Sequence, residues 1–238
     1  MRPGPHPKGE LMRRRILNAS AKVFLEYGYN GASSKMVARL AGVSNGSPFF
    51  LYGNKEGVLL ELVKLVYAEQ FRMTDELIGK DADLLLFYAV ETALQMHITE
   101  LSDALRDLYV MAYTLPSTAE YIHQSTKTKL AEIYAKQFPN ADVEEFYELE
   151  IASSGVLRSY MAKPCDAQMS MARKIQRYLS CCFRIYKVPE AQYQPVIDRV
   201  LTMDLRPAAQ QTVDRIMALV DDGFSSAMNE SRRKAFKD

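Results

Sequence analysis

Cysteine is scarce in this sequence, and the three that occur form no recognisable metal or disulfide pattern. Cys165, Cys181 and Cys182 lack the spacing of thiolate metal ligands or of a disulfide framework. Adjacent cysteines on one helix point in different directions, so we interpret Cys181 and Cys182 as small hydrophobic residues rather than as a thiol sensor. Reduced thiols suit a cytoplasmic protein, which is the localisation that we expect.

Long apolar runs are also lacking, and so is sustained alternation of apolar and polar residues. No run reaches the length needed to cross a membrane, and residues 1–7 lack the apolar segment of a signal peptide. We therefore expect no membrane partner. The absence of a period of two predicts that the chain forms no sheet.

The common catalytic patterns are absent as well. The sequence has no glycine-rich phosphate loop, no zinc-type histidine pair with an acid, and no convincing serine, histidine and aspartate set. His97 and Glu100 would share one helical face, but no third metal ligand accompanies them. We expect no enzymatic activity, no cofactor and no metal site.

Charge is unevenly distributed along the 238 residues. Residues 1–64 hold ten basic and four acidic residues, a net charge of +6, whereas the remaining 20 basic and 25 acidic residues give −5. A basic N-terminal part on an acidic body is typical of a protein whose N-terminal part meets phosphate.

Helical periodicity runs through most of the chain, which predicts an all-α fold. Proline dipeptides at Leu115-Pro116, Pro139, Pro164, Pro189 and Pro207 mark the expected helix boundaries, because the residue before a proline disfavours helix. After Gly79 we expect helices at about 82–99, 101–115, 118–137, 141–162, 166–187, 190–203 and 207–236.

Residues 33–55 read as two short helices joined by a tight turn. Ser33 can cap the first helix, and Gly42 can end it in a left-handed conformation. Ser44 can cap the second helix, with small polar residues leading and aromatic residues trailing. That helix would open with Asn45, Gly46 and Ser47 and continue with Phe49, Phe50 and Tyr52. Such a helix could enter a DNA major groove at its N-terminal end while its other end packs in a core.

The surrounding residues resemble the TetR/AcrR family of transcriptional regulators in register. The resemblance runs through Ile16-Leu17-x-x-Ser20-x-x-x-Phe24-x-x-x-Gly28-Tyr29, Ser33-Ser34-x-x-Val37-Ala38-x-x-Ala41-Gly42-Val43-Ser44 and Gly46-x-x-Phe49-x-x-Tyr52-x-x-Lys55-Glu56-x-x-Leu59. It covers roughly residues 10 to 64. It implies a three-helix helix-turn-helix DNA-binding domain at 10–54, a tail at 1–9 that we expect to be disordered, and a helical effector-binding and dimerisation domain at 55–238.

By this resemblance, the surface that meets double-stranded DNA comprises Ser33, Ser34, Lys35, Ser44, Asn45, Gly46, Ser47, Phe49 and Lys55. Lys35, Asn45 and Ser47 are the expected base readers, while Ser33, Ser44 and Lys55 are expected at phosphates, unless the two serines are only helix caps. Phe49 stands where the family usually has tyrosine, so it loses a hydroxyl that commonly bonds a phosphate.

The resemblance also implies a body cavity for an unknown small apolar or amphipathic effector. Aromatic and methionine residues are dense in the body, and tyrosine offers both an apolar face and a hydroxyl. The alternative is that each of these residues is ordinary core. The candidates for the pocket are Phe71, Phe87, Tyr88, Met96, Tyr109 and Tyr113.

The helices expected at 141–162 and 166–187 are the candidates for a homodimer interface. Apolar and small residues step by three and four along one face of each helix, although both faces could instead pack within one chain. These residues are Phe146, Leu149, Ser153, Val156, Tyr160, Ile175, Tyr178 and Cys182. The sequence thus predicts a ligand-responsive repressor that binds a palindromic operator as a homodimer; the alternative is an architectural DNA-binding protein of the same fold without small-molecule control.

Overall fold

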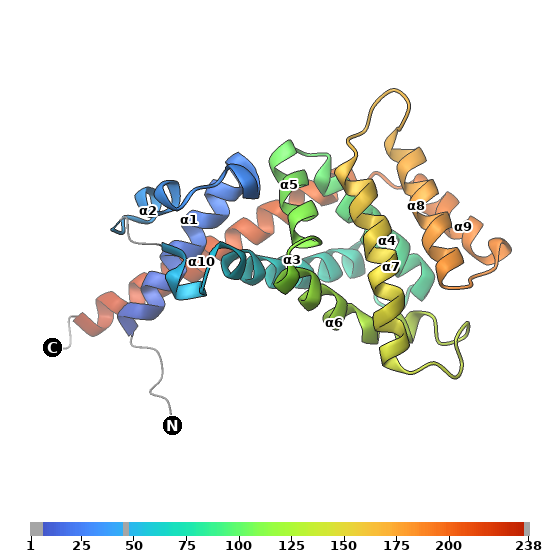
Figure 1. Ribbon diagram of the computed structural model, residues 1–238, viewed down its shortest axis with the longest axis horizontal. Coiled ribbons are helices and arrows are strands. Elements are labelled where there is room, and N and C mark those ends of the chain that lie inside the picture. The colour runs from blue at the N-terminus through green and yellow to red at the C-terminus, as the bar shows by residue number, and fades with distance from the viewer. Residues whose placement is uncertain (1–6, 45–47, 236–238) are drawn as a thin grey trace.

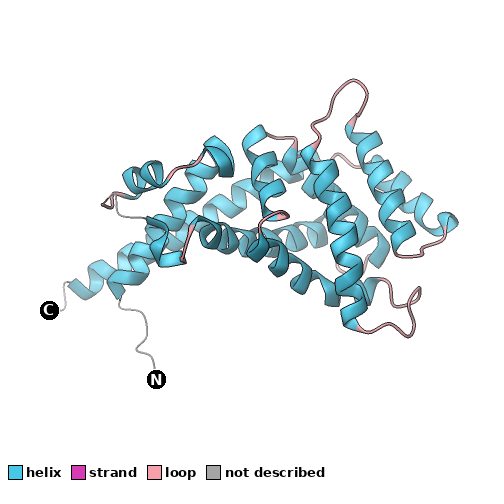
Figure 2. Cartoon of the chain, viewed as in Figure 1, coloured by secondary structure: helices cyan, strands magenta, loops and turns pink. Residues whose placement is uncertain are grey.

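Helices and their connecting loops make up the described residues, which confirms the prediction of an all-α fold. The computed structural model describes residues 7–44 and 48–235, and of residues 7–8 and 222–235 it describes only the backbone (Figure 1). No strand occurs in these two ranges (Figure 2). The elements are α1 (Pro7–Gly31), α2 (Ser34–Ala41), the 3₁₀ helix η1 (Pro48–Tyr52), α3 (Lys55–Ile78), α4 (Leu84–Thr99), α5 (Asp103–Ala112), α6 (Pro116–Ile133), α7 (Val143–Ala162), α8 (Met171–Ile185), α9 (Glu190–Leu201) and α10 (Arg206–Ala235).

Prolines and capping residues set the helix boundaries of the body. α6 begins at Pro116, which needs no amide hydrogen in a first turn, and Pro189 directly precedes α9. Side chains cap the neighbouring helices: Ser102 accepts from the Leu105 amide at 3.1 Å, and Asp142 accepts from the Glu145 amide at 2.9 Å. At the N-terminus α1 already begins at Pro7, so residues 7–9 are helical rather than part of a tail.

Two hydrophobic clusters organise the molecule. The first, which we call the head core, joins α1, α2, η1 and the beginning of α3, and it also takes in Ala112 of α5, Ile122 of α6 and Val220 of α10. The second, the body core, is built on α4 and packs α6 to α10 around it. α1 and α2 lie at one end of the molecule and α7, α8 and α9 at the other, with α3 and α10 running between them (Figure 1).

α4 is the central helix of the body, and most of its residues are buried. Ala89, Val90, Ala93 and Leu94 have no exposed surface at all. The same helix also buries polar side chains, among them Glu91 and Gln95. Because a buried polar group needs a partner, these residues require hydrogen bonds inside the core.

Candidate functional site

The N-terminal turn of α2 presents polar side chains to solvent. Ser33 is its N-cap and accepts a hydrogen bond from the Met36 amide at 3.3 Å, while Ser34 and Lys35 are exposed in the first turn. Gly42 ends the helix in a left-handed conformation with φ of +62°. The predicted caps of this helix are therefore present, and Ser33, Ser34 and Lys35 lie together on one surface, which also suits an anion.

The segment after α2 differs from the helix that the sequence favoured. Asn45, Gly46 and Ser47 lie outside the described residues, so their expected contacts with DNA have no structural counterpart here. Ser44, just before them, is exposed, and the chain from Pro48 to Tyr52 forms a 3₁₀ helix. Proline disfavours helix in the preceding residue, and Gly53 follows with φ of +82°, so only one short helical turn fits between them.

Two adjacent phenylalanines in η1 have opposite environments. Phe49 was expected on the DNA-binding surface, but its side chain is only 5% exposed and packs in the head core. Phe50 is 81% exposed, which is unusual for so large an apolar side chain. Sequence reasoning missed Phe50 because helical spacing had assigned both rings to packing.

Lys55 was expected at a DNA phosphate, but its side chain points into the N-terminal part of the molecule, residues 10–54, which we call the head. Its ammonium donates hydrogen bonds to the Tyr29 carbonyl and, at 2.6 Å, to the Ala32 carbonyl. It also lies 4.3 Å from the centre of the Tyr29 ring, and desolvation lowers the pKa of this lysine. Lys55 therefore satisfies the carbonyls at the end of α1, a role that spacing alone could not distinguish from a phosphate contact.

Two arginines of α1 hold the rest of the head in place. Arg13 donates to the Leu51 carbonyl at 2.7 Å and lies 4.4 Å from the centre of the Tyr52 ring. Arg15 donates to the Ala41 carbonyl at 2.5 Å, at the C-terminal end of α2. These bonds fix η1 and α2 against α1, so the orientation of α1 determines where the exposed residues of the head point.

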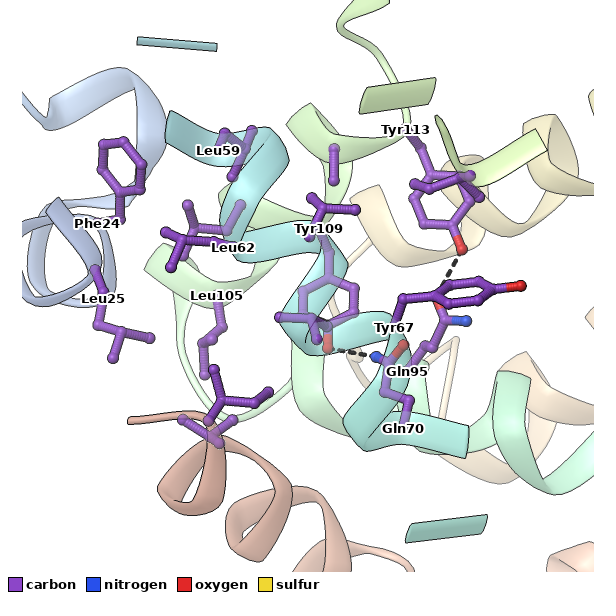
Figure 3. Close-up of a pocket in the computed structure, with 18 of the residues that line it drawn as sticks. Phe24, Leu25, Leu59, Leu62, Tyr67, Gln70, Gln95, Leu105, Tyr109 and Tyr113 are labelled. Carbon is purple, nitrogen blue, oxygen red and sulfur yellow. Dashed lines mark hydrogen bonds between the residues drawn. The ribbon is translucent and has the colours of Figure 1, made fainter. Parts of the chain in front are cut away.

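An apolar cavity of about 100 Å³ lies between the head and the body (Figure 3). Its walls come from α1, α3, α5, α6 and α10, with Gln95 contributed by α4. Two hydrogen bonds join residues of its lining. Gln70 donates to the Tyr109 hydroxyl at 2.6 Å, and the Tyr113 hydroxyl donates to Gln95 at 2.9 Å. We call this cavity the apolar chamber.

A second cavity, of about 40 Å³, adjoins the apolar chamber on the body side. Tyr67, Gln95 and Tyr113 line both cavities and so form their common wall. The lining of the second cavity includes two carboxyl groups, those of Glu91 in α4 and Glu150 in α7. We call this cavity the acidic chamber.

The predicted effector residues divide between these two chambers. Phe71, Phe87 and Tyr88 line the acidic chamber, Tyr109 lines the apolar chamber, and Tyr113 lines both. Met96 lines neither; it is fully buried in the body core. The sequence reasoning missed Glu91, Gln95 and Glu150, although acidic and amide residues within otherwise apolar helices were a signal that could have identified them.

α5 connects the apolar chamber directly with α1. Leu105, Leu108 and Tyr109 face the chamber, and Asp107 on the same helix accepts hydrogen bonds from the Asn30 amide at 2.8 Å and from the Asn30 side chain at 2.6 Å. α1 leaves helical geometry at Gly28, with φ of +71°. A Cβ at Gly28 would lie 2.7 Å from Oδ2 of Asp107, so glycine permits this close approach.

The residues predicted for the dimer interface largely face the interior of their own chain. Phe146, Ser153, Ile175, Tyr178 and Cys182 are at most 3% exposed. Leu149, Val156 and Tyr160 are half-buried and pack against the body core. Periodicity correctly identified the apolar faces of α7 and α8, and within the chain these faces cover the body core.

The opposite face of α7 is the one left open. Ile151 is 49% exposed, and the exposed residues Ala152, Gly155 and Ser159 follow it along the helix. Small side chains on such a face permit the close approach of another helix. No helix in the described part of the chain is long and apolar enough to cross a membrane.

Comparison with known proteins gave a family match in the head. Residues 16–62 match the model of the bacterial regulatory proteins of the tetR family. Over 174 residues the chain is 22% identical to the uncharacterized HTH-type transcriptional regulator YhgD of Bacillus subtilis (strain 168), covering 72% of this chain and 82% of that protein. A crystal structure of a gamma-butyrolactone receptor (ArpA like protein) is 17% identical, with a TM-score of 0.45 over 82% of this chain and 98% of that chain. Another structure of such a receptor is 17% identical, with a TM-score of 0.37 over 76% of this chain and 100% of that chain.

Proposed function

We propose that this chain, a member of the tetR family of bacterial regulatory proteins, is a ligand-responsive repressor that binds a palindromic operator as a homodimer. The head, residues 10–54, would contact DNA through the exposed start of α2 and the segment that follows it. The body, residues 55–238, would bind the effector and form the dimer. α3 begins in the head core and ends in the body, so it joins the two parts.

The observation that carries this proposal is the position of α5. This helix lines the apolar chamber through Leu105 and Tyr109. Its Asp107 accepts a hydrogen bond from the Asn30 amide at the end of α1. α1 in turn holds α2 and η1 by the bonds of Arg13 and Arg15. A shift of α5 on ligand binding would therefore reorient the residues that face DNA.

Effector binding would act by stabilising one arrangement of the heads over another. A ligand shifts such an equilibrium only by the difference between its affinities for the two arrangements. In the dimer, the heads must match the spacing of successive major grooves, about 34 Å along the duplex. An arrangement that alters this spacing would release the operator.

The homodimer would form through the outer face of α7. Its exposed residues include the apolar Ile151 and the small Ala152, Gly155 and Ser159. One head offers few base contacts, so two heads on a palindromic site would supply the affinity and selectivity that a single head lacks. The apolar chamber counts against the alternative, an architectural DNA-binding protein without small-molecule control.

The experiment that tests this function measures binding of the full-length protein to DNA from the region upstream of its own gene. Affinity is measured across a salt series for the wild type, for Lys35→Ala and for Lys136→Ala. Lys136 is an exposed residue after α6 and serves as the matched control. We expect dimer binding to a palindrome that weakens with salt, because phosphate contacts release counterions.

Lys35→Ala should lower affinity for the palindrome and reduce its preference over unrelated DNA. A lost base contact costs about 1–3 kcal/mol, which corresponds to roughly 5- to 150-fold in affinity. Lys136→Ala should bind like the wild type. Weak binding without sequence preference in the wild type would favour the architectural alternative, and equal effects of the two substitutions would contradict the assignment of Lys35.

A further inference from the structure

The acidic chamber holds two carboxyl groups that no cation neutralises. Glu91 is 7% exposed and Glu150 is 5% exposed, and neither forms an ion pair with any described residue. Each accepts one neutral hydrogen bond, Glu91 from Gln95 at 2.8 Å and Glu150 from Ser153 Oγ at 2.9 Å. Burial raises the pKa of Glu91 to about 7 and that of Glu150 to about 8.

Buried acids of this kind are costly to retain in a core. An ionised carboxyl without a partner is unfavourable in a low-dielectric interior, so burial favours the protonated form of each group. Lys129 lines the same cavity, but its ammonium is paired with Glu132, so no cation among the described side chains bonds either carboxyl. A cationic ligand would supply the missing partner to both.

Aromatic rings form much of the remaining wall. Tyr67, Phe71, Phe87, Tyr88, Tyr113 and Tyr178 line the acidic chamber. The faces of such rings attract cations by their quadrupole. One ammonium group already packs against this wall. Lys129 Nζ lies 5.2 Å from the centre of the Phe87 ring and forms an ion pair with Glu132 at 2.9 Å.

The adjoining apolar chamber has no charged side chain in its lining. The two chambers share Tyr67, Gln95 and Tyr113, and a chain of hydrogen bonds runs from the Tyr113 hydroxyl to Gln95 and on to Glu91. A ligand that displaces this wall would have its polar end beside the carboxyls and its apolar end between α1, α5 and α10. Both parts of the cavity therefore fit one amphiphilic molecule.

We propose that the effector is a hydrophobic amine, with its ammonium between Glu91 and Glu150 and its apolar part in the apolar chamber. This inference rests on the proposed function in that it identifies the chemical class of the effector. Binding of the ammonium favours the ionised carboxyls, so it releases protons to the solvent. An anionic ligand of the same length is repelled, and a neutral one leaves the carboxyls without a partner.

The test compares n-octylamine, 1-octanol and octanoate by isothermal titration calorimetry on the full-length protein at pH 8. We expect octylamine to bind more tightly than octanol by roughly tenfold or more, and octanoate to bind most weakly. Titrations in two buffers of different ionisation enthalpy should reveal proton release with the amine only. Equal binding of the three compounds, or preference for octanoate, would overturn the inference.

Variants locate the binding site. Glu91→Gln and Glu150→Gln should each weaken octylamine binding by roughly tenfold and leave octanol binding nearly unchanged. Glu190→Gln, at an exposed residue in the first turn of α9, is the matched control and should bind like the wild type. If a variant fails to fold, the ranking of the three compounds on the wild type still decides the question.

DNA affinity is measured separately, so the two proposals can fail independently. Loss of DNA affinity on adding octylamine, in the wild type but not in Glu91→Gln, supports both. If DNA binds and octylamine does not, the amine inference is overturned and the regulator stands. If octylamine binds through Glu91 and DNA affinity does not change, the site stands and ligand control by it is overturned.

Discussion

Individual side chains in the head have structural roles that compete with contacts to DNA. Lys55 is the clearest case, because its ammonium is held by the carbonyls of Tyr29 and Ala32. Exposure, rather than residue type, separates it from Lys35, which lies free in solvent at the start of α2. These two lysines should therefore respond differently to substitution.

Replacing Lys55 with methionine should destabilise the protein without altering the salt dependence of DNA binding. The substitution removes charged hydrogen bonds to two carbonyls, at a cost of about 1–3 kcal/mol in the free energy of unfolding measured in urea. The slope of log affinity against log salt should stay unchanged, whereas loss of a phosphate contact would reduce it by about 0.9. Lys64→Met, at an exposed surface ion pair, is the control and should change stability little.

Glu91 should make the stability of the protein depend on pH. Its folded-state pKa, about 7, lies above the ordinary glutamate value of 4.5, so the folded state holds more protons between these pH values. The free energy of unfolding should therefore fall as pH rises from about 4.5 to 7, by on the order of 3 kcal/mol. Glu91→Gln removes the contribution of Glu91 to this dependence. The free energy of unfolding of the variant, minus that of the wild type, should therefore increase with pH in a series of urea denaturation measurements.

Other titratable groups face the same chamber and must be considered in that comparison. They are Glu150 of α7, Tyr67 of α3, Tyr113 of α5, Lys129 of α6, Tyr88 of α4 and Tyr178 of α8, with His123 of α6 bonded to Ser154 in the wall. Burial raises the pKa of each buried tyrosine, so these hydroxyls stay neutral below pH 8. Equal pH slopes in Glu91→Gln and the wild type would show that Glu91 titrates normally.

At the scale of elements, α5 connects the apolar chamber with the head. Asp107→Ala removes both hydrogen bonds to Asn30 and should loosen the end of α1. We expect faster hydrogen exchange at residues 28–32 and a stability loss of about 1–3 kcal/mol. Asp103→Ala, in the exposed first turn of the same helix, is the control. Unchanged exchange in Asp107→Ala would contradict the role of α5 as the connection.

The sequence predicted the elements of the body better than the element that was expected to read DNA. Proline and capping residues are local signals, so the boundaries near Pro116, Pro189 and Pro207 were foreseeable. The 3₁₀ helix at Pro48–Tyr52 was not, since it depends on how Pro48 and Gly53 bound one short turn. For the same reason, spacing could not tell that Phe49 would be buried and Phe50 exposed.

The dimer face and the chemistry of the cavity depend on how elements pack, which the sequence does not specify. The stripe through Phe146 and Ser153 was predicted as a dimer face, with packing inside one chain as the alternative, and in the fold both residues are buried within their own chain. The family resemblance implied a pocket in the body, and the aromatic residues supplied its candidates. The pairing of Glu91 with Glu150 in one chamber required two helices far apart in the sequence to be placed side by side.

At the scale of the whole molecule, α7 lies toward the end opposite α1 and α2 (Figure 1). A dimer formed there would hold two heads at a separation set by the length of both bodies. Small tilts of α1, transmitted through α5, would then become larger displacements at the DNA. In the proposed dimer, operator binding would therefore depend on the dimer as well as on the head.

Ile151→Glu tests this dependence directly. A charge at the centre of the outer face of α7 should be unpaired and desolvated in the interface, so the dimer should dissociate. Light scattering after gel filtration should report a monomer of about 27 kDa, the mass of one chain. Leu219→Glu, at a residue 50% exposed on α10, matches Ile151 at 49% and should remain dimeric.

The Ile151→Glu monomer should keep its helical content and its affinity for octylamine, yet lose tight binding to the palindrome, because a single head lacks the second half-site. A variant that stays dimeric would place the interface elsewhere on the body.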